Sequence, residues 1–354
     1  MGFQWRKTHG VTYPKFKAAA VQAAPVYLDL EATVSKSVSL IEAAASEGAS
    51  LIAFPETWLP GYPWWIWLGS PAWGMQFVQR YHQNSLALDS EEFETICSAA
   101  RDNNICVVLG YSERSGGSLY IGQSIIGNDG SVIGSRRKLK PTHVERSVFG
   151  ESDGSSLQVH DTDVGQLGAL CCWEHLQPLS KYAMYSMHEQ VHVASWPSFC
   201  MYLDAAYSFG PEFNNAVSQM YAAEGQCFVL ASCGVVSKDM LDMLIDSNDK
   251  ASLLLEGGGY SMVYAPDGRP IGEPLDPTEE GLVFAEIDLA NIAFAKAAAD
   301  PVGHYSRPDV TRLLLNRKAQ KCVEDMEATD AIAEELEENP GRETNGDTTA
   351  TAQQ

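Results

Sequence analysis

Gly168-Ala-Leu-Cys-Cys-Trp-Glu-His175 is the stretch that most directly indicates the fold of this 354-residue chain. An apolar run ends there in a polar turn, and Pro178, a residue suited to the first turn of a helix, opens the segment Pro178–Glu189. The stretch therefore predicts a strand, a turn and a helix in succession. A helix N-terminus lowers the pKa of a nearby thiol, so Cys171 or Cys172 is a candidate nucleophile. Neighbours in a strand point to opposite faces, so at most one of the two can face a cleft; the alternative for either is an ordinary buried cysteine.

Strands and helices alternate along the rest of the chain. The strands are expected at Lys17–Gln22, Ser50–Phe54, Ile105–Gly110, Ser124–Gly127, Gly168–Cys171, Val191–Ala194, Cys227–Ala231, Tyr260–Tyr264 and Leu282–Ile287. The helices are expected at Glu31–Ser46, Ser90–Asn103, Pro178–Glu189 and Pro211–Glu224. Such alternation predicts an α/β fold. The turn sequences Asn128-Asp-Gly130 and Pro266-Asp-Gly268 predict antiparallel hairpins, so a purely parallel, doubly wound sheet is not expected.

The chain is strongly acidic, with a formal net charge of -22. This charge argues against nucleic acid and against an anionic membrane surface as partners. Much of it is local, because the residues after Cys322 contain ten acidic side chains and the single base Arg342. We therefore expect one domain over residues 1–320 and an acidic, disordered tail over residues 321–354.

No stretch of the sequence has the length of a membrane span, and the N-terminal residues do not form a signal sequence. The eight cysteines are scattered without the spacing of a disulfide framework, which favours a reducing compartment. We therefore expect a cytoplasmic protein.

Three polar residues each follow an apolar run, and side chains at such positions meet at one edge of the sheet in α/β folds. Glu56 follows Leu51–Pro55, Lys138 follows the first predicted hairpin, and Cys172 follows Leu167–Leu170. A carboxylate, an ammonium group and a thiol held together can act as base, electrostatic stabiliser and nucleophile. A lone glutamate or lysine at a strand end is more often a surface residue, so the prediction depends on the combination of the three.

Three ordered blocks of the sequence resemble the signature motifs of the nitrilase branch of the carbon-nitrogen hydrolases. The blocks are Phe54-Pro-Glu-Thr-Trp-Leu-Pro-Gly-Tyr-Pro63, Arg137-Lys-Leu-Lys-Pro-Thr-His-Val-Glu-Arg146 and Cys172-Trp-Glu-His175, and Gly303-His-Tyr-Ser-Arg-Pro-Asp309 is a further run typical of nitrilases. Within the branch, Pro60–Trp65 and Lys181–Gln190 are most similar to arylacetonitrilases. The resemblance covers about residues 16–315 and implies an α-β-β-α sandwich, four-layered across a dimer. It also implies a homo-oligomer, in which such dimers often extend into spirals or filaments.

The resemblance also assigns roles to individual residues. Glu56 matches the general base, Lys138 the stabilising cation and Cys172 the nucleophile, while Glu145 matches a second glutamate that positions the lysine and relays protons. The register of the motifs selects Cys172 over the cysteine before it. It also selects Lys138 over Lys140, which is expected to be a surface charge. No metal and no organic cofactor is needed for this chemistry.

The activity that the resemblance implies is nitrilase activity, converting organic nitriles, arylacetonitriles such as phenylacetonitrile above all, to the carboxylic acid and ammonia. The reaction would pass through a thioimidate and a thioester on Cys172, with an amide as by-product whenever the thiolate leaves before ammonia. The alternatives on the same fold are a cyanide hydratase or dihydratase, an aliphatic nitrilase and an amidase. A non-catalytic, filament-forming protein that keeps the scaffold is the alternative from another functional class.

Aromatic residues cluster around the three blocks and can line an apolar pocket for an aryl group. The candidates for substrate binding are Tyr62, Trp67, Phe149, Trp173 and Trp196. The alternative is that such aromatic residues belong to the core or to a subunit interface. Trp173 follows the nucleophile directly and is the position expected to sense substrate size.

His188-Glu-Gln-Val-His192 matches the HExxH pattern of zinc proteases, so a zinc metallohydrolase with ligands at His188 and His192 and a base at Glu189 is a remote alternative. That chemistry needs both histidines on one face of a continuous helix. The run Val191–Ala194 reads as a strand, so the helix is expected to end near Glu189 and the metal site is not favoured. His175 is expected to make a structural hydrogen bond.

Overall fold

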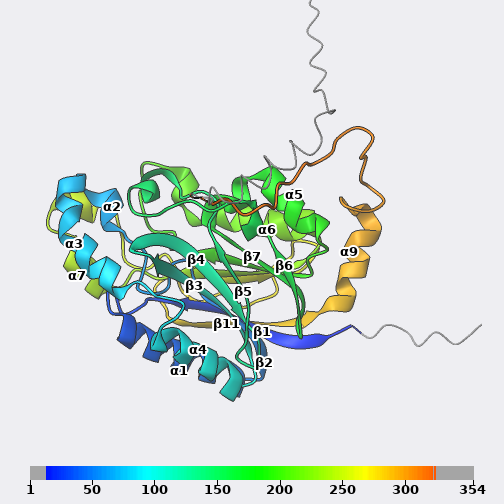
Figure 1. Cartoon of the computed structure of the whole chain (residues 1–354), viewed down its shortest axis with the longest axis horizontal. Helices are drawn as coiled ribbons and strands as arrows, with labels where there is room; N and C mark the ends of the chain where they lie inside the picture. The colour runs from blue at the N-terminus through cyan, green and yellow to red at the C-terminus, as the bar shows by residue number, and fades with distance from the viewer. Residues whose placement is uncertain (1–12, 322, 324–354) are drawn as a thin grey trace, which may run out of the picture. The chain divides into compact units, whose positions relative to one another are not determined.

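The computed structural model describes residues 13–321 and 323. The chain divides into two units, residues 1–317 and 318–354, and all helices and strands of the described part lie in the first unit (Figure 1). The tail predicted for residues 321–354 lies outside the described residues except for Lys321 and Val323, so its disorder stays a prediction.

The described strands hydrogen-bond in the order β5-β4-β3-β2-β1-β9-β8-β7-β6, with β11 on β1 and β10 on β9. Their bounds are β1 Lys15–Ala23, β2 Ala49–Ala53, β3 Cys106–Ser115, β4 Ser118–Ile126, β5 Val132–Arg137, β6 Val159–Thr162, β7 Gly165–Cys171, β8 Val191–Trp196, β9 Phe228–Gly234, β10 Met262–Tyr264 and β11 Gly281–Asp288. The central strands from β3 across to β7 run parallel. Antiparallel partners flank them at both ends: β4 and β5 form the hairpin predicted at Asn128–Gly130, while the antiparallel pairs β3–β4 and β6–β7 were not predicted. The turn predicted at Pro266–Gly268 connects Tyr264 and Pro270, which form an isolated antiparallel bridge.

The two halves of this series are joined over a short length only. β1 and β9 pair at Gln22–Cys233 and Ala23–Gly234, near the C-terminal end of each strand. The rest of β1 pairs with β11 instead, from Lys15 to Gln22. The halves β5–β1 and β9–β6 therefore face one another as two sheets, and their facing sides share one core layer.

Each parallel strand sends alternate side chains into two core layers, as the period of a strand requires. Val191 and Val193 of β8 pack between the two sheets, whereas Trp196 of the same strand packs under helices. In β2, Leu51 faces the layer between the sheets and Ile52 faces the opposite helix layer. The order helix, sheet, sheet, helix confirms the predicted α-β-β-α sandwich, while four layers across a dimer stay a prediction.

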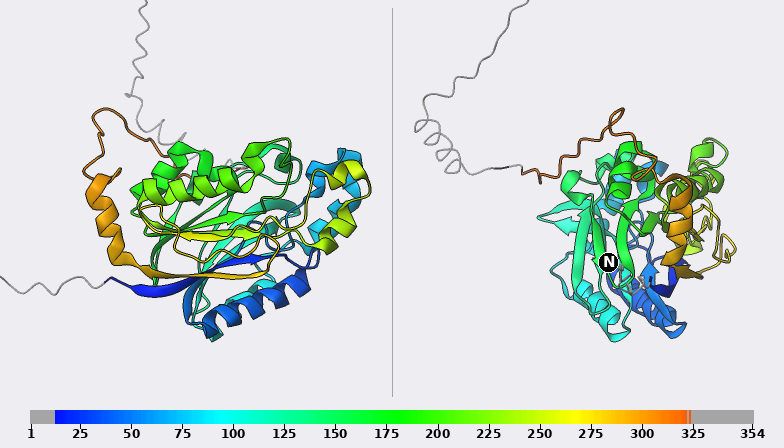
Figure 2. Two further views of the ribbon diagram at one scale, coloured as in Figure 1. Left: turned by 180° about the vertical axis from the view of Figure 1, so that it is seen from behind. Right: turned by 90° about the vertical axis from the view of Figure 1, so that its right-hand side faces the viewer.

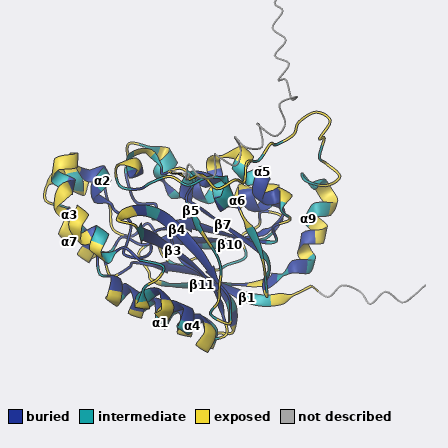
Figure 3. Cartoon of the chain, viewed as in Figure 1, coloured by how far each residue is buried: buried dark blue, intermediate teal, exposed yellow. Residues whose placement is uncertain are grey.

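Helices cover the outer face of each sheet. Figures 1 and 2 show α1 and α4 on one side, α5 and α6 on the other, and α2, α3 and α7 together at one end. Figure 3 shows α1 and α4 buried toward the sheet and exposed outward. Their bounds are α1 Leu30–Ser46, α2 Trp65–Leu68, α3 Pro71–Asn84, α4 Glu91–Asp102, α5 Pro178–Ser186, α6 Pro211–Gly225, α7 Lys238–Leu244, α8 Asn248–Ala251 and α9 Ile292–Ala299. Among the described helices, none combines the length and the apolar character that a bilayer crossing needs.

Some elements differ from the predictions made from the sequence. α3 was not expected, because its sequence carries Gly74 in the helix interior and buries only two large side chains, Phe77 and Tyr81. The helix expected over Pro178–Glu189 ends earlier, at Ser186, since the chain turns through a left-handed conformation at His188. The short edge strand β6 and the terminal helix α9 were also missed.

Candidate active site

Glu56 lies at the end of β2, where the chain passes close to a neighbouring strand. Its backbone N–H donates to the carbonyl oxygen of Trp196 at the end of β8, with an N–O distance of 3.3 Å. Gly110 of β3 permits this path, because a Cβ at that position would lie 2.0 Å from the carbonyl oxygen of Pro55. The glycine therefore allows the strand end to turn inward and carry Glu56 into the interior.

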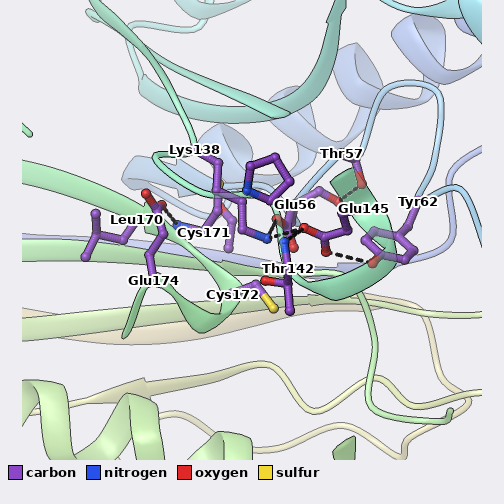
Figure 4. A network of polar contacts seen from close by, with 12 residues as sticks. Glu56, Thr57, Tyr62, Lys138, Thr142, Glu145, Leu170, Cys171, Cys172 and Glu174 are labelled. Carbon is purple, nitrogen blue, oxygen red and sulfur yellow. Dashed lines mark hydrogen bonds and ion pairs between the residues drawn. The ribbon is translucent and has the colours of Figure 1, made fainter. Parts of the chain in front are cut away.

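Lys138 follows β5 and lies fully buried between two carboxylates. Its Nζ donates to Glu56 Oε1 at 2.7 Å and to Glu145 Oε2 at 2.9 Å. Each of the three residues is at most 2% exposed. Figure 4 shows the ammonium group between the two carboxylates, with Cys172 beside them. Residues from three segments far apart in the sequence thus meet, as the strand-end pattern predicts.

The two carboxylates differ in how completely their oxygens are bound. Glu145 lies in the 3-10 turn η1 (His143–Ser147), and its Oε2 also accepts from the backbone N–H of Thr142 at 2.6 Å. Its Oε1 accepts from the Tyr62 hydroxyl at 2.7 Å, and Trp67 Nε1 donates to that hydroxyl at 3.0 Å. Glu56 Oε2, in contrast, is buried and has no hydrogen-bond partner among the described residues. Glu145 is held in place, whereas Glu56 keeps a free oxygen that can take a proton.

The charges of the cluster follow from burial and proximity. Burial opposes the charge of Lys138, but Glu145 and Glu56 outweigh it and hold the pKa of Lys138 well above its usual value. Burial raises the pKa of Glu56 to about 8, against the opposing effect of Lys138. Lys138 is therefore a permanent cation, and Glu56 is a carboxyl group that exchanges its proton near neutral pH.

Cys172 begins the 3-10 turn η3 (Cys172–Leu176) directly after β7, with a left-handed φ of 46°. Residues other than glycine seldom adopt this conformation, so the surroundings must hold it. Burial raises the pKa of the thiol well above its usual value; Lys138 opposes the rise and Glu56 reinforces it. The prediction of a thiol pKa lowered by a helix N-terminus is wrong, because the α-helix begins only at Pro178 and the thiol is buried. The thiol is neutral and needs a base.

A buried ion pair that was not predicted from the sequence joins the turn beginning at Cys172 to the segment that carries Lys138. Arg136 donates through both terminal nitrogens to Glu174, at 2.9 and 2.7 Å. The Glu174 carboxylate also accepts from the backbone N–H groups of Cys171 and Leu139, each at 2.8 Å. The pair thereby ties the end of β7 to the residue after Lys138. Arg136 lies in β5, two residues before Lys138, and this spacing is the signal that could have revealed it, since residues two apart along an extended chain point to the same side.

A cavity opens over Cys172 and Glu145 and is lined mainly by aromatic rings. Its walls include Tyr62, Trp64, Trp67, Trp173, Trp196, Phe199 and Phe209. Lys138 and Glu56 are buried and are not among the lining residues, but Lys138 donates to Glu145, which is one of them. Tyr62, Trp67, Trp173 and Trp196, predicted from the sequence as pocket residues, therefore all face the space next to the thiol.

Phe149 is the predicted pocket residue that the structure places elsewhere. It does not line the cavity over Cys172 but packs edge-on against Tyr81, with 6.1 Å between ring centroids. The reason is the turn η1, after which the Phe149 N–H donates back to the carbonyl oxygen of Glu145. This turn directs the Phe149 side chain toward α3 and away from the thiol.

The HExxH pattern does not form the helical arrangement that a zinc protease requires. α5 ends at Ser186, His188 is exposed in a turn, and Glu189 and His192 are buried and hydrogen-bonded to each other at 2.7 Å. Within residues 13–321 and 323, no group of three or more His, Cys, Asp or Glu side chains is arranged to hold a metal ion. His175 makes the structural hydrogen bond expected of it, to the carbonyl oxygen of Cys172.

The carbon-nitrogen hydrolase family model matches residues 17–297, which span the sandwich and the cluster around Lys138. The chain belongs to the carbon-nitrogen hydrolase family. A nitrilase of Pseudomonas syringae is 59% identical over 321 residues, covering 91% of this chain and 96% of that protein. An arylacetone-specific nitrilase of Alcaligenes faecalis is 52% identical, over 91% of this chain and 90% of its own length. An aliphatic nitrilase of Rhodococcus rhodochrous is also 52% identical, over 86% and 83%.

Among solved structures, the NitFhit protein of C. elegans matches this fold with a TM-score of 0.65 at 20% identity, over 88% of this chain and 70% of that one. Such a distant match supports the fold alone. The curated relatives, at much higher identity over nearly the whole sandwich, confirm the resemblance to the nitrilase branch. This carbon-nitrogen hydrolase is accordingly a nitrilase-type hydrolase.

Proposed function

We propose that this nitrilase hydrolyses arylacetonitriles to carboxylic acids and ammonia, with Cys172 as nucleophile, Glu56 as general base and Lys138 as stabilising cation. The observation that supports this most directly is a neutral thiol at the floor of an aromatic-lined cavity, next to a carboxylate with one free oxygen and a permanent cation. Glu145 positions Lys138 and fixes the cavity wall through Tyr62.

The first half of the reaction forms a covalent thioimidate. Glu56 Oε2 takes the thiol proton, and the Cys172 sulfur attacks the nitrile carbon, so one π bond of the nitrile becomes a lone pair on nitrogen. Lys138 stabilises the charge that develops there. The proton that Glu56 accepted passes to the nitrogen, which leaves a neutral thioimidate and an ionised base ready for the next step.

The second half consumes two molecules of water. The first adds to the thioimidate carbon with Glu56 as base, and Glu56 returns the proton to the nitrogen, which gives a tetrahedral intermediate with one hydroxyl and one amino group. Glu56 then takes the hydroxyl proton and passes it to the amino group as the C–N bond breaks, so ammonia leaves and a thioester remains on Cys172. The second water releases the carboxylic acid and restores the thiol. If the tetrahedral intermediate expels the thiolate before ammonia, the product is the amide.

The walls of the cavity support an arylacetonitrile as substrate. Trp173 is held by a hydrogen bond from its Nε1 to Asn214 Oδ1 at 2.9 Å, and its ring lies 5.2 Å from that of Phe209. Trp67 stacks on His143 across the cavity wall, with 5.4 Å between ring centroids. Fixed rings around a small space favour a flat apolar group over a hydrated ion such as cyanide. An aliphatic nitrile is the second candidate, because the Rhodococcus relative of nearly equal identity is an aliphatic nitrilase.

A panel of phenylacetonitrile, benzonitrile, an aliphatic dinitrile and cyanide tests this specificity, with acid, amide and ammonia measured for each. We expect the highest kcat/KM for phenylacetonitrile and acid as the main product. Trp173→Ala should shift the preference toward bulkier arylacetonitriles by about tenfold, because it removes the ring beside the nucleophile. Preference for cyanide, or an aliphatic nitrile hydrolysed better than any aryl substrate, would contradict the proposal.

We expect kcat/KM to rise with pH up to about 8. Glu56 can take the thiol proton only in its ionised form, and burial raises its pKa to about 8, so activity is lost as the pH falls below that value. Nitriles do not ionise in this range, and the profile therefore reports on the enzyme. A rate that stays constant through the acid side of neutrality would rule out Glu56 as the base.

A further inference from the structure

A row of buried titratable side chains leads away from the backbone of Cys172, outside the cavity lining. His175 Nδ1 lies 2.6 Å from the carbonyl oxygen of Cys172, and His175 Nε2 lies 2.9 Å from His192 Nε2. His192 Nδ1 lies 2.7 Å from Glu189 Oε1, and the Tyr221 hydroxyl donates to Glu189 Oε2 at 2.7 Å. His175, His192 and Glu189, which we call the histidine relay, are at most 2% exposed, and none of them lines the cavity.

The direction of the relay follows from counting protons. A carbonyl oxygen only accepts, so the bond to Cys172 requires the proton of His175 on Nδ1. A neutral His175 then has a bare Nε2, which must accept from His192 Nε2–H. His192 in turn has a bare Nδ1, and the donor to it must be a protonated Glu189.

An ionised Glu189 beside a doubly protonated His192 would contain the same number of protons, but it would place two charges in the interior. Burial lowers the pKa of His192 well below its usual value and raises that of Glu189 to about 8, so the neutral arrangement is favoured. Burial likewise lowers the pKa of His175 to about 3.

The surroundings of Glu189 offer it no compensating cation. In the part of the chain that the structure describes, the ion-pair partner of Glu189 is His192 alone. Tyr221 from α6 donates to it, and Tyr185 from α5 and Cys227 before β9 are the other titratable groups near it. On β7, Gly168 leaves room for the carboxyl group, since a Cβ there would lie 1.9 Å from Glu189 Oε1.

The groups around the two imidazoles act mainly through packing. Trp196 of β8 stacks on His175 with 5.4 Å between ring centroids, and the Tyr221 ring stacks on His192 at 3.8 Å. The ion pair Arg136–Glu174 acts on both histidines: its arginine disfavours and its glutamate favours their protonation. The two opposite effects come from one bonded pair and largely cancel.

We propose that a protonated Glu189, His192 and His175 form a one-directional hydrogen-bond relay that holds the Cys172 carbonyl and so positions the nucleophile. This proposal rests on the assignment of Cys172 as the nucleophile of the nitrilase reaction. The relay residues are positioning residues, because they contact the Cys172 backbone and not the substrate. A left-handed cysteine at a strand end needs such a restraint, and the relay supplies it from residues that do not line the cavity.

Loss of the proton from Glu189 to solvent reverses the relay. An ionised Glu189 accepts from His192 Nδ1–H, His192 Nε2 then accepts from His175 Nε2–H, and His175 Nδ1 is left bare. Two lone pairs then face one another at the Cys172 carbonyl, and that hydrogen bond is lost. Activity therefore declines as the pH rises through the pKa of Glu189. The profile of activity against pH then has an alkaline limb set by Glu189 as well as the acid limb set by Glu56.

Paired substitutions test the relay through activity. Glu189→Leu removes the donor and should lower kcat by about tenfold with KM little changed. Glu189→Gln offers an amide donor to His192 and an acceptor to Tyr221 but does not ionise. It should recover most of the loss and move the alkaline decline to higher pH. Recovery with an unchanged alkaline limb, or no recovery in a variant with the wild-type circular dichroism spectrum, would overturn the proposal.

Spectroscopy of the full-length wild-type protein tests the proton positions without any substrate. At neutral pH, nitrogen-15 spectra of the imidazoles should show His175 protonated on Nδ1 and His192 on Nε2, with neither titrating in the weakly acidic range. Infrared difference spectra against Glu189→Gln should show the carbonyl stretch of a protonated carboxyl group. An ionised Glu189 or a His175 protonated on Nε2 would refute the relay even if the enzyme proves to be an arylacetonitrilase, and the expected spectra would support it even if it does not.

Discussion

Cys172→Ala is expected to lower kcat for nitrile hydrolysis by at least about 10³-fold, to the background of the preparation. In the proposed mechanism the sulfur forms the covalent bond to the nitrile carbon, and a methyl group cannot do so. The thiol is neutral and mostly buried, so its removal costs little charge stabilisation and the free energy of unfolding should change by about 1 kcal/mol or less. Product release measured by ammonia and by chromatography of acid and amide gives the loss directly.

Cys171→Ala is the matched control for this substitution. Cys171 directly precedes Cys172 and is fully buried. Its sulfur lies 4.0 Å from Arg136 Nη1, and the residue does not line the cavity. We expect this variant to hydrolyse nitriles within a few-fold of the wild type, since its thiol takes no part in the reaction. A protein that loses activity with Cys171→Ala and keeps it with Cys172→Ala would reverse the assignment. Mass spectrometry of the acyl-enzyme trapped at low pH identifies the labelled cysteine independently.

Lys138→Ala is expected to lower kcat by about 10²–10³-fold, because it removes the positive charge that stabilises the developing charge on the nitrile nitrogen. It also leaves Glu56 and Glu145 buried without their shared cation. Such an uncompensated buried charge costs about 3–5 kcal/mol, unless the carboxylates become protonated. Burial already raises the pKa of Glu56 and Lys138 opposes that rise, so the pKa of Glu56 rises further without Lys138. The variant should therefore lose most stability at alkaline pH and recover part of it at acid pH.

Lys140→Ala provides the comparison for Lys138→Ala. Lys140 is two residues further along, exposed, and paired with Glu151 at the surface. It should keep full activity and a melting temperature close to that of the wild type, since an exposed ion pair contributes little. Measuring kcat and thermal unfolding at two pH values for both variants separates the loss of the catalytic cation from the loss of any lysine. A Lys138→Ala protein as active as Lys140→Ala would remove the lysine from the mechanism.

Much of the candidate site could be predicted because the residues proposed to be catalytic follow strands at recognisable points. Glu56, Lys138 and Cys172 each follow an apolar run, and parallel strands bring such positions to one edge. Tyr62 and Trp173 lie next to the motif residues in sequence, so their place in the cavity wall also followed from proximity along the chain. Phe149 shows the limit of this reasoning, since one 3-10 turn was enough to direct it away from the thiol.

The sequence by itself determined the α/β class, the mixed character of the sheet and the residues that converge, because strand period and turn chemistry are local properties. Only the tertiary structure decided the protonation states. Burial raises the pKa of the Cys172 thiol and keeps the thiol neutral, whereas the local strand-to-helix pattern had predicted a lowered pKa. Likewise, the HExxH run contributes Glu189 and His192 to the relay behind Cys172, because the helix ends before them and β8 buries them. Both outcomes depend on which groups surround a side chain and on how much water reaches it. The spacing of residues along the chain predicts neither of these two properties.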